Sequence, residues 1–342
     1  MKILVTGAAG FIGYHLANRL AEEKHSVSCI DNINDYYDVE LKYSRLEALG
    51  FNQNILQTSK TNDFIVSSLY PAICFNKMEL CDAERLTGLF SEGSFDIVMH
   101  LAAQAGVRYS LANPQAYINA NIQGFFNVLE AARIYPPRHL VYASSSSVYG
   151  LNTKTPFSEN DPVDKPVSLY ATTKRSNELM AHTYSHLYHI PVTGLRFFTV
   201  YGPWGRPDMA PFIFTKSIIE GKPINVFNNG NMKRDFTFID DIVEGIIRVL
   251  NRIPEGNAED ATPATIYNIG NGTPVPLMDF IHILENALGK KALLQYAPMQ
   301  PGDVSATWAD CSALERATGF YPHTTLSDGI NKFVKWYRDY YN

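Results

Sequence analysis

The hydrophobic pattern at the start of the chain predicts a buried strand followed at once by a helix. Residues 2–6 (Lys-Ile-Leu-Val-Thr) form a short apolar run rich in β-forming side chains, which is typical of a strand buried on both faces of a parallel sheet. In residues 14–23 the apolar positions Leu16, Ala17 and Leu20 follow a helical spacing instead. Because so few residues separate the two patterns, strand and helix must be joined by one tight turn.

The same alternation of strand-like and helix-like segments continues along the chain and predicts an α/β protein with a Rossmann-like doubly wound parallel sheet. A polar stretch at residues 34–77 is longer than a simple crossover requires, which indicates a helix plus an irregular insertion. The 342 residues suffice for one large core with a smaller C-terminal lobe. The further segments expected are strands at 26–30, 95–101, 139–143 and 265–270 and a long helix at 114–133.

Three regularly spaced glycines, Gly7, Gly10 and Gly13, occupy the turn between the first strand and helix. In this context Gly7 permits the tight turn, Gly10 lets a pyrophosphate approach the backbone, and Gly13 lets the helix pack closely on the strand. The free N–H groups at the positive end of the helix then bind the diphosphate. We therefore expect the turn, with Phe11 and Ile12, to bind a dinucleotide. The alternative is an ordinary glycine-rich turn.

An acidic residue at the end of the second expected strand indicates which dinucleotide is bound. Asp31 lies about 20 positions beyond the glycines, where a carboxylate accepts hydrogen bonds from the adenosine ribose and repels a 2′-phosphate. Neither Asn32 nor the next three residues supply an Arg or Lys, so we predict NAD rather than NADP. Asn32 and the later strand end at Leu101, Ala102 and Ala103 are expected to line the same cofactor. The alternative for Asp31 is a solvated carboxylate at a strand end.

Charge and composition exclude several classes of protein. With 29 Lys and Arg against 34 Asp and Glu the net charge is −5, which argues against nucleic acid as a partner. No stretch reaches the ~18 apolar residues of a membrane span, and the apolar start is too short for a signal peptide. The four cysteines have neither a paired nor a metal-ligand spacing. Free thiols, no metal site and a cytoplasmic location are therefore expected.

A tyrosine and a lysine four residues apart, Tyr170 and Lys174, are the candidate proton-transfer pair, because residues at this spacing share one face of a helix. A tyrosine at its usual pKa of ~10 is a poor base at neutral pH. A nearby ammonium and a nicotinamide cation are expected to lower that pKa. A hydroxyl from the serine run at 144–147 would hold the substrate oxygen in line. The alternative is a chance pair on a helix surface.

The chain resembles the extended short-chain dehydrogenase/reductases over nearly its whole length, and among them the nucleotide-sugar epimerases. It is most similar to UDP-glucuronate 4-epimerases. The motifs that carry the resemblance are the glycine turn, Asp31, His-Leu-Ala-Ala at 100–103, Asn121, Ser-Ser-Val-Tyr-Gly at 146–150, the Tyr170–Lys174 pair and Arg-Asp-Phe-Thr at 234–237, with Asp-Tyr-Tyr-Asp at 35–38 and residues 104–110 and 196–210 for the narrower group.

The resemblance implies roles for the residues around the reacting carbon. Tyr170 would be the base, Lys174 its partner and a ribose ligand, and Ser145 the hydroxyl that orients the sugar O4. Ser146 and Ser147 would lie near the sugar. Asn121 is expected among the cofactor-binding residues, with NAD as the cofactor and a UDP-sugar as the substrate.

The resemblance also implies how the rest of the substrate is held. Thr199 and Arg206 would meet a glucuronate carboxylate, while UDP-galactose epimerases carry Asn at the Thr199 position. Arg234 would bind a UDP phosphate, and Asp303 the uridine ribose. Arg108 is a further candidate substrate ligand, with a helix-end charge that interacts with the helix dipole as its alternative. The alternative for Arg206 is a solvated charge in a loop rich in glycine and proline. Galactose epimerases have an Arg three residues before the Asp, whereas this chain has Gln300, so the second phosphate contact stays open.

Other activities are weighed from the same residues. A neutral-sugar 4-epimerase acting on UDP-glucose or UDP-N-acetylglucosamine is the main alternative. Sugar dehydratases and uronate decarboxylases of the family carry acidic residues where this chain has Ser146 and Ser147, which counts against both. The remaining alternative is a non-catalytic NAD-binding scaffold. The presence of Tyr170, Lys174 and Ser145 together counts against it, because binding alone needs no base.

The expected organisation is an NAD-binding domain at 1–195, to which residues 236–270 return, and a nucleotide-sugar-binding lobe from 196–235 and 271–342. The site would lie between them, at the carboxyl ends of the strands. The resemblance further implies a homodimer formed through two helices of each subunit, here 114–133 and 169–188.

Overall fold

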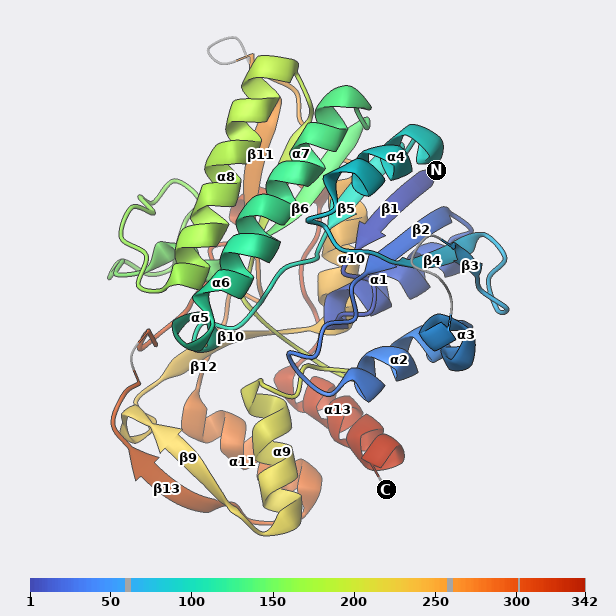
Figure 1. Ribbon diagram of the computed structural model, residues 1–342. Helices are drawn as coiled ribbons and strands as arrows, with labels where there is room; N and C mark the ends of the chain where they lie inside the picture. Colours follow the sequence, from blue (N-terminus) through green and yellow to red (C-terminus); the bar gives the residue numbers. More distant parts are fainter. Residues whose placement is uncertain (59–62, 257–260, 301, 342) are drawn as a thin grey trace.

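A large parallel sheet runs through the computed structural model, which describes residues 1–58, 63–256, 261–300 and 302–341 (Figure 1). In the described part of the chain it has eight strands in the order β11-β7-β6-β5-β1-β2-β4-β3. Only the short edge strand β3 runs antiparallel to its neighbour. The doubly wound sheet predicted from the sequence is confirmed. Its strands are β1 (Lys2–Thr6), β2 (Ser26–Asp31), β3 (Ile65–Val66), β4 (Ile73–Lys77), β5 (Ile97–His100), β6 (His139–Ser145), β7 (Val192–Phe197) and β11 (Ala264–Ile269).

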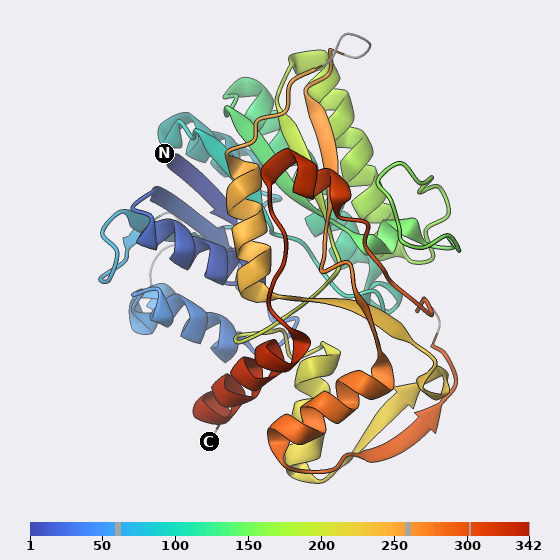
Figure 2. The same cartoon turned by 180° about the vertical axis from the view of Figure 1, so that it is seen from behind.

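Helices cover both faces of this sheet (Figures 1 and 2). One face carries α4 (Ala83–Gly93), α7 (Gly124–Ile134) and α8 (Leu169–Tyr188), and the other carries α1 (Phe11–Glu22), α10 (Ile239–Leu250) and α12 (Ser312–Thr318). The burial of β1 on both faces of the sheet explains why its sequence is apolar without alternation. Ile3 and Val5 pack into the core on the α1 side, while Leu4 packs into the core on the α4 and α7 side.

The helix predicted at 114–133 is present but not regular. It begins as α6 (Pro114–Tyr117), continues as a π-helical segment η1 (Ile118–Gln123) and ends as α7. A π-helical segment adds a residue to the turn and re-aims the side chains within it, and such segments are common at functional sites.

The polar stretch after β2 forms a helical insertion, as predicted. It contains α2 (Val39–Ala48) and α3 (Gln53–Thr58) before the chain re-enters the sheet at β3 and β4. The segment between β2 and α2 passes toward the second half of the molecule rather than staying on the sheet (Figure 1). This path brings residues 33–38 close to the site.

A smaller lobe lies beyond the carboxyl ends of the strands (Figure 1). Its core forms where α9, α11 and α13 pack with β9 and β10. In the described ranges no helix is both long and apolar enough to cross a membrane. The remaining elements are α5 (Tyr109–Ala112), η2 (Ser146–Tyr149), β8 (Thr199–Tyr201), α9 (Ala210–Glu220), β9 (Pro223–Phe227), η3 (Asn228–Gly230), β10 (Lys233–Phe238), β12 (Pro274–Pro276), α11 (Leu277–Leu288), β13 (Leu293–Ala297) and α13 (Leu326–Tyr341).

Candidate active site

One large cavity of about 1360 Å³ lies between the carboxyl ends of the strands and the smaller lobe. Its lining comes from the glycine turn, the ends of β2, β5 and β6, the start of α8, and the segments 197–217, 223–227 and 300–307. A pocket for one drug-sized ligand is usually about 300–1,000 Å³. The cavity is therefore large enough for two ligands side by side, a dinucleotide and a second nucleotide.

The glycine turn forms a cradle that side chains would fill. Gly7 has φ +74°, and a Cβ there would lie 2.7 Å from the backbone nitrogen of Ala102. A Cβ on Gly13 would lie 2.1 Å from the carbonyl oxygen of Gly7, so α1 packs directly on the turn. Gly10 caps α1, and no side chain of the described chain occupies that cap. The first amides of α1 therefore stay available for an anion such as a diphosphate.

The acidic residue after the turn is built into it. One carboxylate oxygen of Asp31 accepts a hydrogen bond from the N–H of Ala9 at 3.1 Å, and the other accepts from Ile33 at 2.8 Å. Asp31 still lines the cavity, as does Asn32, whose amide donates to Glu79 at 3.1 Å. The alternative of a merely solvated carboxylate at a strand end is therefore not what the structure has. Asp31 braces the glycine turn and faces the space where an adenosine ribose would lie.

The strand end after β5 lines the cavity with Leu101, Ala102 and Ala103, as expected. It is fixed because the N–H of Ala102 donates to the hydroxyl of Thr6 at 3.1 Å. The same hydroxyl is bonded to His100 at 2.9 Å. The small side chains of the two alanines keep this wall close to the glycine turn.

Tyr170, Ser145 and Lys174 converge on one wall of the cavity. Interaction with the Ser145 side chain favours the ionised form of the Tyr170 phenol, so the two side chains lie close together. Lys174 is buried and donates to the carbonyl oxygen of Ala143 at 2.8 Å. The pair is thus not a chance pair on a helix surface.

The serine run separates into two roles. Ser145, at the end of β6, also bonds Ser147 through its hydroxyl at 3.1 Å. Ser146 and Ser147 follow in η2 and line the cavity beside it. Ser144 turns away, because its hydroxyl donates to the buried carboxylate of Glu178 at 2.7 Å. Of the four serines, Ser145 is the one whose side chain favours the Tyr170 phenolate.

The protonation of this group differs from the sequence-based expectation. Burial raises the pKa of Tyr170 above its ordinary value, against the opposing effects of the Ser145 hydrogen bond and the Arg206 charge. Burial also lowers the pKa of Lys174 to about 8. The expectation that Lys174 lowers the phenol pKa was therefore wrong for the protein alone. For each of the two groups, removal from water is the largest effect on the pKa.

Asn121 stands behind the site rather than in it. It lies in the π-helical segment η1, is buried, and is not part of the cavity wall formed by the described residues. Its amide donates to the carbonyl of Gln104 and the hydroxyl of Thr173, both at 3.0 Å, and its oxygen accepts from the N–H of Gln104 at 2.8 Å. Because its side-chain groups are already bonded, Asn121 positions the loop after β5 against α8. The expected direct cofactor contact does not match this geometry.

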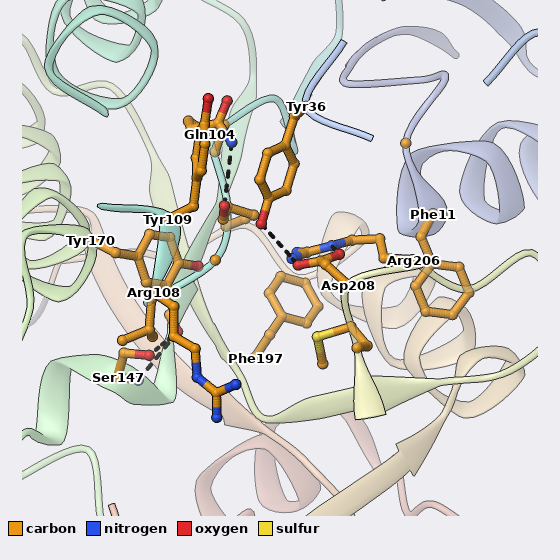
Figure 3. Close-up of a pocket in the computed structure, with 18 of the residues that line it drawn as sticks. Phe11, Tyr36, Gln104, Arg108, Tyr109, Ser147, Tyr170, Phe197, Arg206 and Asp208 are labelled. Atoms are coloured by element: carbon orange, nitrogen blue, oxygen red, sulfur yellow. Dashed lines mark hydrogen bonds and ion pairs between the residues drawn. The ribbon is translucent and has the colours of Figure 1, made fainter. Parts of the chain in front are cut away.

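Of the two residues predicted to bind a carboxylate, Arg206 lies across the cavity from Tyr170 (Figure 3). Thr199 begins β8, and Arg206 follows in the loop before α9; both line the cavity. Arg206 pairs with Asp208 through two hydrogen bonds, from Nε at 3.0 Å and from Nη2 at 2.5 Å. The Tyr36 hydroxyl donates to the same carboxylate at 3.0 Å. Arg206 is therefore a fixed charge rather than the solvated one that was its alternative.

Three charged residues gather where the cavity meets the smaller lobe. Arg108 pairs with Asp303 at 2.9 Å and lies over the ring of Phe227 at 4.8 Å. Arg234 donates to the carbonyl of Ser305 at 3.3 Å. Burial lowers the pKa of Arg234, partly offset by the Asp303 charge and reinforced by that of Arg108. Two guanidinium groups near one carboxylate leave a net positive charge, as a diphosphate site needs.

Sequence reasoning missed Asp208 and Tyr36 as part of this site. The Arg-Pro-Asp order at 206–208 was a usable signal, because a proline in a short turn brings its neighbours together. Tyr36 was marked only as part of the Asp-Tyr-Tyr-Asp match at 35–38, which gave it no role and no partner, and it lies 172 positions from Asp208.

The fold and this site define a dinucleotide-dependent enzyme of the α/β class. A model of the NAD dependent epimerase/dehydratase family matches residues 3–270, and the chain belongs to that family.

Comparison with individual relatives narrows the kind of epimerase to which the chain is similar. The chain is 45% identical to a probable UDP-glucuronate 4-epimerase of Rhizobium meliloti, with 100% of this chain and 98% of that one covered. It is 47% identical to UDP-glucuronate 4-epimerase 4 of Arabidopsis thaliana over 100% of this chain and 76% of that one. Among solved structures, it is similar to UDP-glucuronic acid 4-epimerase from Bacillus cereus in complex with UDP-glucuronic acid and NAD, with a TM-score of 0.86, 33% identity and 99% of each chain covered.

Proposed function

We propose that the protein is an NAD-dependent 4-epimerase that interconverts UDP-glucuronate and UDP-galacturonate. The observation that carries this proposal is the arrangement of one cavity. Tyr170 with its Ser145 partner lies on one wall, and Arg206 lies on the other. A base and a fixed cation on facing walls match a sugar that has both a reacting hydroxyl and a carboxylate.

The reaction needs a proton acceptor at the 4-hydroxyl. NAD, when bound, takes the hydride from C4 and later returns it. Tyr170 removes the hydroxyl proton and gives it back, while Ser145 holds the sugar oxygen in line. Burial opposes loss of the Tyr170 proton, so the Ser145 bond and the Arg206 charge, which both favour the phenolate, matter for the rate.

The 4-keto sugar must turn over in the cavity while the nucleotide stays in place. Arg108, Arg234 and Asp303 lie where they can hold the UDP part. The keto group of a uronate is β to the carboxylate, an arrangement that loses carbon dioxide readily. We propose that Thr199 and Arg206 hold the carboxylate in an orientation that disfavours this loss. No net redox change occurs, so the cofactor recycles in place.

A direct assay without added cofactor tests the proposal. The purified protein is incubated with UDP-glucuronate or with UDP-glucose, and the sugars are resolved by NMR. UDP-galacturonate from the acid alone is the expected result. Conversion of UDP-glucose alone would keep Tyr170 and the fold and refute the role of Arg206, leaving the neutral-sugar 4-epimerase. A pentose product instead would indicate a decarboxylase. No conversion of either sugar, even with NAD added, would favour a non-catalytic NAD-binding scaffold.

We also propose a homodimer formed through α7 and α8, which lie side by side (Figure 1). Large apolar side chains are exposed on both helices, among them Phe126, Ile134, Leu179 and Leu187. Light scattering should give the mass of two chains. Leu187→Glu should yield a monomer, whereas Leu293→Glu, at a similarly exposed leucine on β13, should not. A dimeric Leu187→Glu variant would place the interface elsewhere.

The division into an NAD-binding part and a sugar-binding lobe stays a prediction. Strand β11, within the predicted returning segment 236–270, joins the large sheet beside β7. Helix α12, within the range predicted for the lobe, packs on that sheet as well. We place the enzyme in the cytoplasm, where its cysteines would remain free thiols.

A further inference from the structure

The guanidinium assigned to the substrate carboxylate is already held by a carboxylate of the protein. Arg206 donates from Nε and Nη2 to the two oxygens of Asp208. A guanidinium has five N–H groups in a rigid planar fork. This side-on pair uses two of them, so the end-on edge formed by Nη1 and the rest of Nη2 remains for a ligand in the cavity.

A tyrosine from the insertion after β2 fixes the carboxylate in turn. The Tyr36 hydroxyl donates to Oδ2 of Asp208 at 3.0 Å, and its ring packs on that of Tyr109 with 4.7 Å between centroids. Figure 3 shows Tyr36, Asp208 and Arg206 in one connected row. Burial works against ionisation of Asp208, but the Arg206 charge and the two hydrogen-bond partners outweigh it and lower its pKa. Asp208 is thus an anion at neutral pH.

The backbone on both sides of Arg206 is also fixed. His15 donates to the carbonyl of Pro203 at 2.9 Å, and Arg45 donates to the carbonyl of Trp204 at 2.6 Å. On the other side, the N–H of Met209 bonds the carbonyl of Arg206 itself at 3.2 Å. The remaining freedom of Arg206 lies in its side-chain rotamers, and Asp208 is the group that restricts them.

We propose that Asp208, held by Tyr36, is a specificity-determining residue that orients Arg206 toward a carboxylate on the bound sugar. This inference rests on the function proposed above. The negative charge of Asp208 repels a second carboxylate from the side-on edge of Arg206 and leaves the end-on edge as the one approach. A neutral sugar offers that edge only an uncharged hydroxyl, which is a weaker acceptor than a carboxylate and cannot accept two parallel bonds.

The test compares Asp208→Asn, Tyr36→Phe and their combination in the NAD-loaded enzyme. Asparagine keeps the shape of Asp208 but can accept only one of the two bonds from Arg206. For UDP-glucuronate, Asp208→Asn should raise KM roughly tenfold with little change in kcat, the loss expected for one charge-assisted hydrogen bond. The inhibition constant of UDP, which lacks the uronate sugar, should not change. Glu47→Gln, which removes an exposed charge from the same insertion outside the cavity lining, should behave as the wild type.

The double variant separates a chain of contacts from independent effects. Tyr36→Phe alone should raise KM for UDP-glucuronate by a smaller factor. Because Tyr36 acts through Asp208, the double variant should match Asp208→Asn alone. A lower KM for Asp208→Asn would show that Asp208 competes with the substrate and would overturn the proposal, as would equal losses for UDP-glucuronate and UDP.

Failure of this inference is distinguishable from failure of the proposed function. Binding of UDP-glucuronate and UDP-glucose to each protein is measured by calorimetry. A wild type that does not prefer the acid sugar overturns both. A wild type that prefers it, together with an Asp208→Asn variant that prefers it equally, overturns the role of Asp208 alone.

Discussion

Replacing Gly13 with alanine should release the cofactor while leaving the fold in place. The added Cβ would lie 2.1 Å from the Gly7 carbonyl oxygen, and real Cβ atoms essentially never come within 3.0 Å of another heavy atom. Helix α1 and the glycine turn must therefore separate by about 0.9 Å, the difference between these distances. The obstacle is backbone on both sides, so no side chain can rotate away to relieve it.

The expected loss of cofactor affinity follows from the diphosphate that the N-terminus of α1 is expected to bind. A shift near 1 Å moves the first amides of α1 out of hydrogen-bond range of a diphosphate, for which N–O distances are about 2.7–3.2 Å. Loss of two hydrogen bonds to a charged group, at about 1.5 kcal/mol each, weakens binding by about 3 kcal/mol, or about 100-fold. Overpacking elsewhere in proteins costs about 1–3 kcal/mol of stability, which a chain with this much buried core should survive.

The assay measures NAD bound to the purified protein and the activity regained when NAD is added. Gly13→Ala should retain little cofactor and respond to added NAD. Gly88→Ala is the matched control, because among the described residues no atom lies within 4 Å of a Cβ at that position of α4. Thermal unfolding without cofactor shows whether either variant is folded. A folded Gly13→Ala variant that keeps wild-type cofactor content would refute the assignment of this turn as the diphosphate seat.

Three further predictions concern Tyr170, Lys174 and, behind that wall of the cavity, Asn121. Tyr170→Phe should lower kcat by at least ~10²–10⁴-fold, the usual contribution of a general base, while bound NAD, measured after extraction, stays at the wild-type level. In cofactor-free protein, the stability of the wild type relative to Lys174→Met should rise with pH between about 8 and the unfolded value. The pKa of Lys174 is lower in the folded protein than in the unfolded chain, so the unfolded chain binds more protons in that pH window, and above it burial of the charge no longer opposes folding. Urea titrations at several pH values measure the two free energies of unfolding. A stability difference between wild type and variant that does not change with pH would contradict the prediction. Asn121→Ala should cost about 1–3 kcal/mol of stability by leaving the buried backbone N–H and carbonyl of Gln104 without the Asn121 side chain and removing one of the two bonds of the Thr173 hydroxyl. Denaturant unfolding measures the loss.

Local patterns predicted the parts of the site that neighbouring residues build. The glycine turn could be found because a strand, three glycines and a helix follow each other within 23 residues. The family resemblance assigned Ser145 to the site, and it is the serine whose side chain favours the Tyr170 phenolate. In each case the interacting groups are close in sequence or lie on adjacent strand ends of a regular sheet.

Burial and long-range contacts were not visible in the sequence. The pKa of Tyr170 was expected to fall, but the side chain lies in a site where burial dominates, and no pattern of residue types reveals how far a phenol is removed from water. The π-helical turn that carries Asn121 was expected to be regular helix, because periodicity does not distinguish a single wider turn. Tyr36 fell in a polar insertion whose path depends on contacts with residues far along the chain.

The insertion after β2 makes sugar recognition depend on the cofactor half of the molecule. The loop that presents Arg206 is held by His15 of α1 and by Arg45 of α2, which also donates to the carbonyl of Ala9 in the glycine turn at 2.9 Å. The preference for an acid sugar is therefore not contained in loop 199–210 alone. Moving that loop into a neutral-sugar epimerase should fail to transfer binding of UDP-glucuronate unless residues 33–45 move with it. A chimera carrying the loop alone that binds UDP-glucuronate as tightly as the wild type would show that the insertion has no part in recognition.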